Sequence, residues 1–196
     1  MVGGLAALAA VIGLVFWSIN RSPSATEATD AGDSAQVNSP AASTTADTTT
    51  RAARDAGAEA SLVRMLPPGY PPAACRPVDP QQGAVATVTC DGNVDPGGPP
   101  SATYLLLRDR PALDAAFVAA VRPDAVVTCP GNIQSPGPWR RNATPQKVSG
   151  TLVCGVQDGV PTLAWTDTER MLVGVVRSDS PGPTLDQLYQ WWSSHS

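Results

Sequence analysis

The chain has 196 residues, of which 42% are hydrophobic and 15% are charged. Its formal net charge is −4 and its sequence pI is about 4.8, so it lacks the clustered positive charge that displaces counterions from nucleic acid. This charge balance argues against nucleic-acid binding. The hydrophobic content suits one globular domain, although part of it is concentrated at the start of the chain.

Residues 1–19 form an uncharged apolar run, MVGGLAALAAVIGLVFWSI. A helix of about 20 residues crosses the roughly 30 Å hydrocarbon core of a bilayer, and the ring of Trp17 is placed to sit at the lipid headgroups. We therefore predict a transmembrane helix that anchors the protein in the lipid bilayer. A signal peptide cleaved between Ser22 and Ala25 is the alternative, but the basic residues that begin such a peptide are missing.

Residues 20–57 consist largely of Ser, Ala, Thr, Asp and Gly, and Val37 is almost the only large apolar side chain in the first part of this segment. Such a composition cannot bury enough apolar surface to offset a backbone entropy loss of about 1–2 kcal/mol per residue. We predict a disordered stalk here, followed by a folded domain over residues 58–196.

Helix-forming residues are collected in two places before the end of the domain. From Arg51 to Met65 they predict a short helix, which must end before Pro67 because proline disfavours the helical conformation of the residue that precedes it. A second helix is predicted over 110–121, where one apolar stripe contains Leu113, Phe117, Ala120 and Val121.

The rest of the domain consists of short β-branched segments separated by turn residues, which is typical of an antiparallel sheet. Asp158-Gly159 predicts a tight hairpin, because glycine accepts the positive φ that such a turn needs. The strands are predicted at 84–90, 102–107, 125–129, 150–156, 162–165 and 171–176.

The C-terminal segment LDQLYQWW predicts a helix that docks on the sheet through one apolar side. Thr184 and Gln187 have the spacing of a capping box at its start. Of the adjacent Trp191 and Trp192, we expect one ring in the core and one exposed. The predicted fold class is α+β, a mainly antiparallel sheet with two or three helices packed on one face.

All four cysteines follow the apolar run, at Cys75, Cys90, Cys129 and Cys154. Persistent disulfides need an oxidising compartment, so we predict that the domain lies outside the cytoplasm. A zinc site is disfavoured because no two cysteines have the close C-x-x-C spacing. Sequence order does not choose among the three connectivities that four cysteines allow, but we favour Cys75–Cys90 and Cys129–Cys154, which would staple neighbouring segments.

Patterns that indicate catalysis are missing from the sequence. The single histidine, His195, is next to the last residue, which leaves little room for a Ser-His-Asp triad. The sequence contains no G-x-S-x-G, H-E-x-x-H or phosphate-binding loop, and the spacing of its carboxylates does not pair them. We therefore predict a protein that is not an enzyme by itself and that uses no metal or other cofactor.

Two segments are candidates for ligand binding. In Trp139-Arg140-Arg141, an indole and two guanidinium groups could stack on and pair with a sugar, phosphate or carboxylate ligand. The alternative is a partly buried Trp139 with two solvated arginines. In MLPPGYPPAAC, a proline-rigid backbone could present Tyr70 for recognition, although the segment could equally be a plain lead-in to Cys75.

Between about Leu62 and Trp192, the Cys, Pro, Gly and Trp residues follow a recognisable order. Its parts are LPPGY (66–70), Cys75, VTC (88–90), GGP (97–99), ATY (102–104), CPG (129–131), SPGPW (135–139), VCG (153–155) and LYQWW (188–192). This order resembles the extracytoplasmic C-terminal domain of some mycobacterial serine/threonine protein kinases. The resemblance implies a sensor domain held outside the membrane by one helix and connected to cytoplasmic kinase signalling.

The chain departs from that plan because it has no Gly-rich loop, H-R-D or D-F-G sequence, so we do not expect kinase activity. It is either a stand-alone relative of the sensor domain or the part that follows an absent kinase domain. The function we predict is a membrane-anchored, extracytoplasmic sensor or ligand-binding domain, and the alternative is a structural or protein-interaction module of the cell envelope. Close contacts between transmembrane helices could make a homodimer through small residues, namely Gly3, Gly4, Ala6, Ala7, Ala9 and Ala10.

Overall fold

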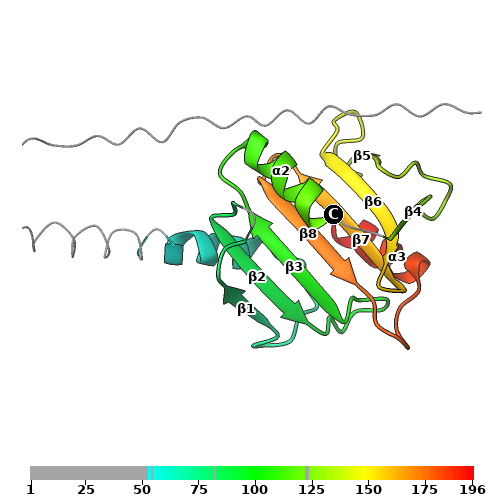
Figure 1. The fold of residues 1–196 in the computed structure, drawn as a ribbon, viewed down its shortest axis with the longest axis horizontal. Helices are drawn as coiled ribbons and strands as arrows, with labels where there is room; N and C mark the ends of the chain where they lie inside the picture. Colours follow the sequence, from blue (N-terminus) through cyan, green and yellow to red (C-terminus); the bar gives the residue numbers. More distant parts are fainter. Residues whose placement is uncertain (1–52, 54, 82, 122–123) are drawn as a thin grey trace, which may run out of the picture. The chain divides into compact units, whose positions relative to one another are not determined.

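The computed structural model describes residues 53, 55–81, 83–121 and 124–196, and all of these belong to one compact unit (Figure 1). The predicted transmembrane helix and most of the predicted stalk lie outside the described residues. Within the described part of the chain, no helix combines the length and the apolar composition that crossing a membrane requires.

An antiparallel sheet of eight strands forms the centre of the domain. Its strand order is β1-β2-β3-β8-β7-β6-β4, and the short strand β5 also pairs with β6. The strands are β1 (Cys75–Val78), β2 (Ala86–Asp91), β3 (Ser101–Leu106), β4 (Ala125–Val127), β5 (Gly137–Trp139), β6 (Gly150–Gln157), β7 (Val160–Asp167) and β8 (Leu172–Arg177).

Three helices accompany the sheet: one over residues 55–65, α2 (Arg110–Ala120) and α3 (Leu185–His195). The predicted capping box begins α3, where the Thr184 hydroxyl accepts a hydrogen bond from the backbone N–H of Gln187 and the Gln187 side chain accepts one from that of Thr184. These three helices and the antiparallel sheet confirm the predicted α+β class.

The expectation that all the helices pack on one face of the sheet is wrong. The helix α2 covers one face through Leu113 and Ala116, whereas α3 and the helix over 55–65 pack on the opposite face (Figure 1). The reason lies in the strands, because consecutive residues such as Leu172 and Val173 are both apolar and point to opposite faces. Both faces must therefore be covered.

The six predicted strands are present, with ends within two residues of the predicted ones, but β1 and β5 were not predicted. Each of these two strands is short and contains a proline, Pro77 or Pro138, which lacks the N–H that a strand interior donates. Each pairs with only one neighbour, where a missing donor is tolerated. The predicted hairpin is also confirmed, since Asp158 and Gly159 both have positive φ between β6 and β7.

Both favoured disulfides are confirmed, and together they use all four cysteines. Cys75 and Cys90 are directly opposed across β1 and β2, so their bond fixes an edge strand to the sheet. Cys129 follows β4, and its bond to Cys154 fixes that segment to β6. The disulfides thus hold both ends of the sheet.

Candidate functional site

A continuous series of aromatic rings runs through the core on the α3 face of the sheet. Successive ring centroids lie 5.4–6.3 Å apart, mostly in edge-to-face arrangements that favour aromatic pairs. We call this series the aromatic row, and in spatial order it consists of Tyr70, Tyr104, Trp165, Trp192 and Trp139.

Trp139 is held rigidly at the end of β5. Its indole N–H donates a 2.8 Å hydrogen bond to the backbone oxygen of Thr166, and its side chain is only 5% exposed. The residue opposite it on β6 is Gly150, where a Cβ would collide with that same Thr166 backbone oxygen. The predicted ligand-binding Trp139 therefore has a fixed position and little free ring surface.

Both tryptophans near the end of α3 are buried, so the expectation that one ring would be exposed is wrong. Trp191 is 2% exposed and donates its indole N–H to the side-chain oxygen of Asn93. Trp192 is 5% exposed and packs on Trp139, but its buried indole N–H has no hydrogen-bond partner. A hydrogen bond thus fixes the orientation of Trp191 but not that of Trp192.

The two arginines after Trp139 have different surroundings. Arg141 forms ion pairs with Asp167, whose side chain is 3% exposed, and with Glu169. Its guanidinium also lies over the Trp139 ring, 5.2 Å from the ring centroid. Arg140 is exposed and forms no ion pair with any carboxylate among the described residues. Of the two predicted ligand-binding arginines, only Arg140 has an unpaired charge.

The buried Asp167 carboxylate is well satisfied. It also pairs with Arg170 and accepts hydrogen bonds from the backbone N–H groups of Glu169 and Arg170. The neighbouring Glu169 carboxylate pairs with Lys147, and this hydrogen bond and charge lower the pKa of Glu169 below its ordinary value. The ion pairs and hydrogen bonds of this charged cluster hold the turn between β7 and β8. Because each charge lies beside an opposite charge, the cluster is suited to a structural role.

Tyr70 points into the domain instead of presenting its ring to solvent. Its hydroxyl lies 2.8 Å from the hydroxyl of Tyr104, and the two rings meet edge to face. Burial raises the pKa of Tyr70 to about 12 and raises the pKa of Tyr104 as well. Tyr70 therefore joins the segment before β1 to the core.

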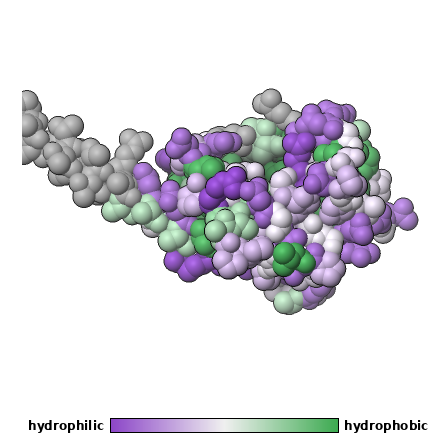
Figure 2. All heavy atoms as spheres, turned by 90° about the horizontal axis from the view of Figure 1, so that it is seen from below, coloured by the Kyte–Doolittle hydropathy of each residue, from purple (hydrophilic) through white to green (hydrophobic). Residues whose placement is uncertain are grey.

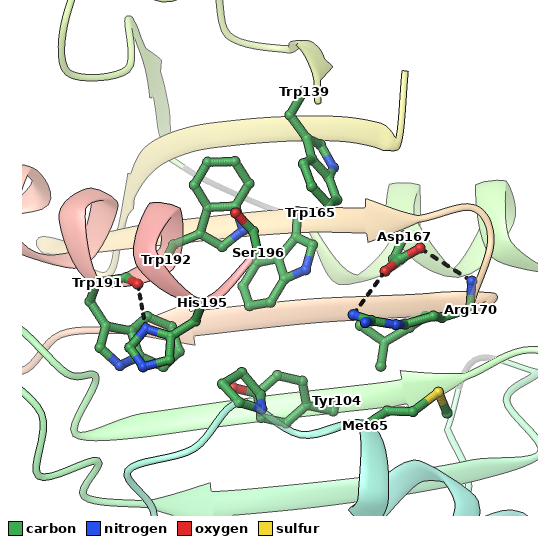
Figure 3. Close-up of a pocket in the computed structure, with 12 residues that line it drawn as sticks. Met65, Tyr104, Trp139, Trp165, Asp167, Arg170, Trp191, Trp192, His195 and Ser196 are labelled. Atoms are coloured by element: carbon green, nitrogen blue, oxygen red, sulfur yellow. Dashed lines mark hydrogen bonds and ion pairs between the residues drawn. The ribbon is translucent and has the colours of Figure 1, made fainter. Parts of the chain in front are cut away.

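Two cavities lie beside the aromatic row. The first, which we call the inner cavity, has a volume of about 30 Å³, enough for one or two water molecules (Figure 3). Figure 3 shows the nitrogen-bearing edge of Trp192 on the side of the ring that faces Trp165 and Ser196. The inner cavity is lined by Met65, Pro67, Tyr104, Trp139, Trp165, Asp167, Arg170, Leu172, Trp191, Trp192, His195 and Ser196.

The second cavity, which we call the outer pocket, has a volume of about 190 Å³ and shares Trp139, Trp192 and Ser196 with the inner cavity. It combines apolar and aromatic walls with the unpaired Arg140, as small-molecule sites commonly combine apolar walls with a few polar groups. The outer pocket is lined by Ile133, Pro138, Trp139, Arg140, Asn142, Leu152, Tyr189, Trp192, Ser193 and Ser196.

A wider depression of about 430 Å³ lies beside the start of α2. Among the described residues that line it, Arg110 is the only charged one, and this arginine is already paired with Asp114. None of these described lining residues is aromatic. It therefore has fewer groups that could bind a ligand than the outer pocket has.

The structure brings Ser194, His195 and Asp95 into one hydrogen-bonded series. His195 Nδ1 lies 2.9 Å from Ser194 Oγ, and His195 Nε2 lies 3.0 Å from an Asp95 oxygen. However, Nδ1 also lies 2.6 Å from the backbone oxygen of Trp191, which can only accept a hydrogen bond. Because Nδ1 donates to that oxygen, it cannot take the Ser194 proton, and the arrangement lacks the base that a triad needs.

The outer pocket contains residues that the sequence did not single out for binding, namely Asn142, Tyr189 and Trp192. Tyr189 and Trp192 are three positions apart on α3 and therefore lie on the same side of the helix. That spacing predicted a docking surface, and it was also the signal that two of the pocket's aromatic walls come from one helix, while the third, Trp139, comes from β5. Asn142 carried no comparable signal.

No family model matches this chain, and neither the curated proteins nor the solved structures include a significant match to it.

Proposed function

We propose that this chain is a membrane-anchored protein whose extracytoplasmic domain binds a ligand in the outer pocket and catalyses no reaction by itself. The observation that carries the proposal is the position of Arg140, an unpaired cation at a pocket walled by Tyr189 and Trp192. Apolar walls with a single charged group can orient a small ligand.

The placement outside the cytoplasm is supported by the two disulfides, which persist in an oxidising compartment. The anchor in this proposal is the apolar run over residues 1–19. The resemblance to the sensor domains of mycobacterial serine/threonine kinases supports a role in signal reception. In this view a ligand in the outer pocket is the signal, and the anchor connects the domain to signalling partners.

The chemistry of the pocket supports binding without catalysis. Among the described residues, Arg140 and Tyr189 are the only ionisable side chains that line it, and burial raises the pKa of Tyr189 above its ordinary value. A protonated phenol and a guanidinium cannot remove a proton from a ligand near neutral pH. The residues that surround the pocket are therefore suited to holding a molecule.

A ligand screen on the full-length protein in detergent micelles tests this proposal. Tryptophan fluorescence and thermal shift would be recorded against cell-wall fragments, lipid headgroups and small anions. We expect at least one saturable response that is weakened by Arg140→Gln. The matched control is Arg108→Gln, which removes another exposed arginine that pairs with no described carboxylate and lies outside the pocket.

A response that Arg140→Gln leaves unchanged would place binding elsewhere and contradict the proposed site. A blank across the whole panel would favour the alternative, a structural or protein-interaction module. Figure 2 shows one face of the described residues, and its apolar residues form small separate spots instead of one continuous patch. That face does not offer the broad apolar surface of an obligate protein interface.

A further inference from the structure

The charge of the outer pocket indicates the charge of its ligand. Some arginines at the surface of the described domain are compensated, as Arg76 is by Asp91 and Arg177 is by Asp158, whereas Arg64, Arg108 and Arg140 form no ion pair with a described carboxylate. Of these three, only Arg140 lines the outer pocket, and no described Asp or Glu side chain lines it. The last residue, Ser196, also lines the pocket, but its α-carboxylate forms no ion pair with Arg140. A guanidinium in this setting can form a bidentate, charge-assisted pair with a carboxylate.

The size of the outer pocket limits the rest of the ligand. Its volume of about 190 Å³, measured in the same way as the 30 Å³ of the inner cavity, holds roughly six to twelve water molecules at about 15–30 Å³ each. One six-membered ring with its substituents is of that size. A longer chain or a fused ring system would extend out of the pocket.

The residues that line the outer pocket suit a ligand ring that has apolar faces and also carries hydroxyl groups. The ring centroids of Tyr189 and Trp192 lie 5.6 Å apart and the two rings are tilted relative to each other. Pro138 adds a further apolar wall. The Asn142 amide and the Ser193 hydroxyl are exposed and make no hydrogen bond with another described side chain or backbone group. Both groups can donate to and accept from hydroxyl groups.

We infer that the outer pocket binds a sugar acid, a six-membered sugar ring that carries one carboxylate. The carboxylate pairs with Arg140, the ring packs on the aromatic walls, and the ring hydroxyls bond to Asn142 and Ser193. This inference rests on the proposed function, since it names the ligand class of the same pocket.

The indole N–H groups provide a local readout. Hydrogen bonds to Thr166 and Asn93 fix the N–H groups of Trp139 and Trp191, whereas the N–H of Trp192 is unpaired. A ligand in the outer pocket would pack on the rings of Trp192 and Trp139 and shift both indole NMR signals, and the Trp192 signal should shift more because no hydrogen bond holds its N–H. The signal of Trp191, which does not line this pocket, would stay in place.

The test is a titration of the ¹⁵N-labelled full-length protein in detergent micelles, with indole signals assigned by Trp→Phe substitutions. The probes are glucuronate, glucose and cyclohexanecarboxylate. We expect glucuronate to shift the Trp192 signal saturably and to bind about tenfold more tightly than glucose. Arg140→Gln should reduce glucuronate affinity by about the same factor, and Arg108→Gln should leave it unchanged.

Each other outcome separates this inference from the proposed function. Equal affinities for glucose and glucuronate, or no effect of Arg140→Gln, would overturn the claim that a ligand carboxylate pairs with Arg140. If cyclohexanecarboxylate binds as tightly as glucuronate, the claim that the pocket recognises the hydroxyl groups of a sugar ring is overturned. If none of the three probes shifts Trp192 but another molecule of the screen does, the inference fails and the proposed function stands. If nothing shifts Trp192, both fail.

Discussion

The two faces of the sheet differ in the size of the side chains that cover them. The α3 face is packed with Trp and Tyr rings, whereas the α2 face is packed with Leu, Val and Ala around a single aromatic residue, Phe117. The inner cavity and the outer pocket, of about 30 and 190 Å³, lie on the aromatic side. The cavity beneath α2 measures only about 10 Å³, and the wider depression of about 430 Å³ beside the start of α2 has no aromatic residue among its described lining residues.

This difference has a physical cause. Small branched side chains have enough freedom to interdigitate and fill the space between a helix and a sheet. On the α3 face, the rings of Trp139 and Trp192 pack edge to face, and both rings line the inner cavity and the outer pocket. The α2 face therefore stabilises the domain, and the α3 face both stabilises it and offers space with aromatic walls for a ligand. Four substitutions can break or sharpen this comparison.

The largest effect is expected from Trp191→Ala on the aromatic side. The substitution removes a fully buried ring and the hydrogen bond to Asn93, so unfolding free energy should fall by about 3–5 kcal/mol. Leu113→Ala, on the α2 face, is the control and should lower it by about 2–5 kcal/mol. Urea denaturation gives both values. Only Trp191→Ala should also weaken ligand binding in the outer pocket. If Leu113→Ala weakened ligand binding equally, the proposed difference between the α3 face and the α2 face would be contradicted.

The next largest effect is expected from Asp167→Ala, at the end of β7. Removing this buried carboxylate leaves Arg141 without its main partner, and we expect a loss of about 3 kcal/mol in the free energy of unfolding. Asp114→Ala breaks an exposed pair with Arg110 on α2 and should change it by only about 0.3–0.5 kcal/mol. Similar losses in the two variants would show that the Arg141–Asp167 pair is not structural.

A smaller effect is expected from Gly174→Ala in β8. Gly174 lies opposite Trp165 on β7 and Tyr104 on β3, and an added Cβ would collide with the indole of Trp165. The shifted ring should lower the free energy of unfolding by about 1–3 kcal/mol and should change tryptophan fluorescence. Gly57→Ala is the control, because a Cβ there meets no atom within 4 Å and alanine favours a helix. Unchanged fluorescence in Gly174→Ala would contradict the close packing of Trp165.

Local sequence patterns predicted much of this fold. Alternating β-branched segments located six strands, and the Thr184 and Gln187 spacing located the start of α3. Sequence order left three disulfide connectivities open, and the one we favoured, which staples neighbouring segments, is the one that forms. The position of the helices on both faces could not be predicted in the same way. It depends on the burial of consecutive residues in β7 and β8, where a run of apolar residues does not reveal which of them faces which helix.

The site was less predictable because its contacts join distant parts of the chain. Arg140 and Arg141 are adjacent and chemically identical, yet only Arg141 reaches Asp167, which lies 26 positions further along. That contact depends on how β5 and β7 each pair with β6, and no local pattern specifies both pairings. Likewise, the proline-rich segment around Tyr70 gave no sign that Tyr104 would be its partner. The sequence therefore indicated candidate residues but could not separate the free ones from the paired ones.

The smallest effect is expected from Tyr70→Phe, at the end of the aromatic row. Loss of the hydroxyl bond to Tyr104 should lower the free energy of unfolding by about 1 kcal/mol near neutral pH, because the ring is retained. Burial raises the pKa of Tyr70 from 10.0 to about 12, so in the native protein its phenol stays protonated at pH values where the unfolded chain ionises. The stability that this provides is present below pH 10 and is lost as the pH rises from 10 to 12.

The alkaline decline in stability should therefore be shallower in Tyr70→Phe than in the parent protein. Urea denaturation at a series of pH values measures this decline, and absorbance near 295 nm follows phenol ionisation directly. Tyr189→Phe is the comparison variant, because that phenol lies outside the row and makes no hydrogen bond with another described residue. Burial raises its pKa as well, but less than it raises the pKa of Tyr70, so its removal should flatten the decline less. If the two variants decline with the same slope, Tyr70 is no more buried in solution than Tyr189, and its contact with Tyr104 inside the domain does not form. In that case the first segment of the domain is not fixed to the aromatic side by this contact.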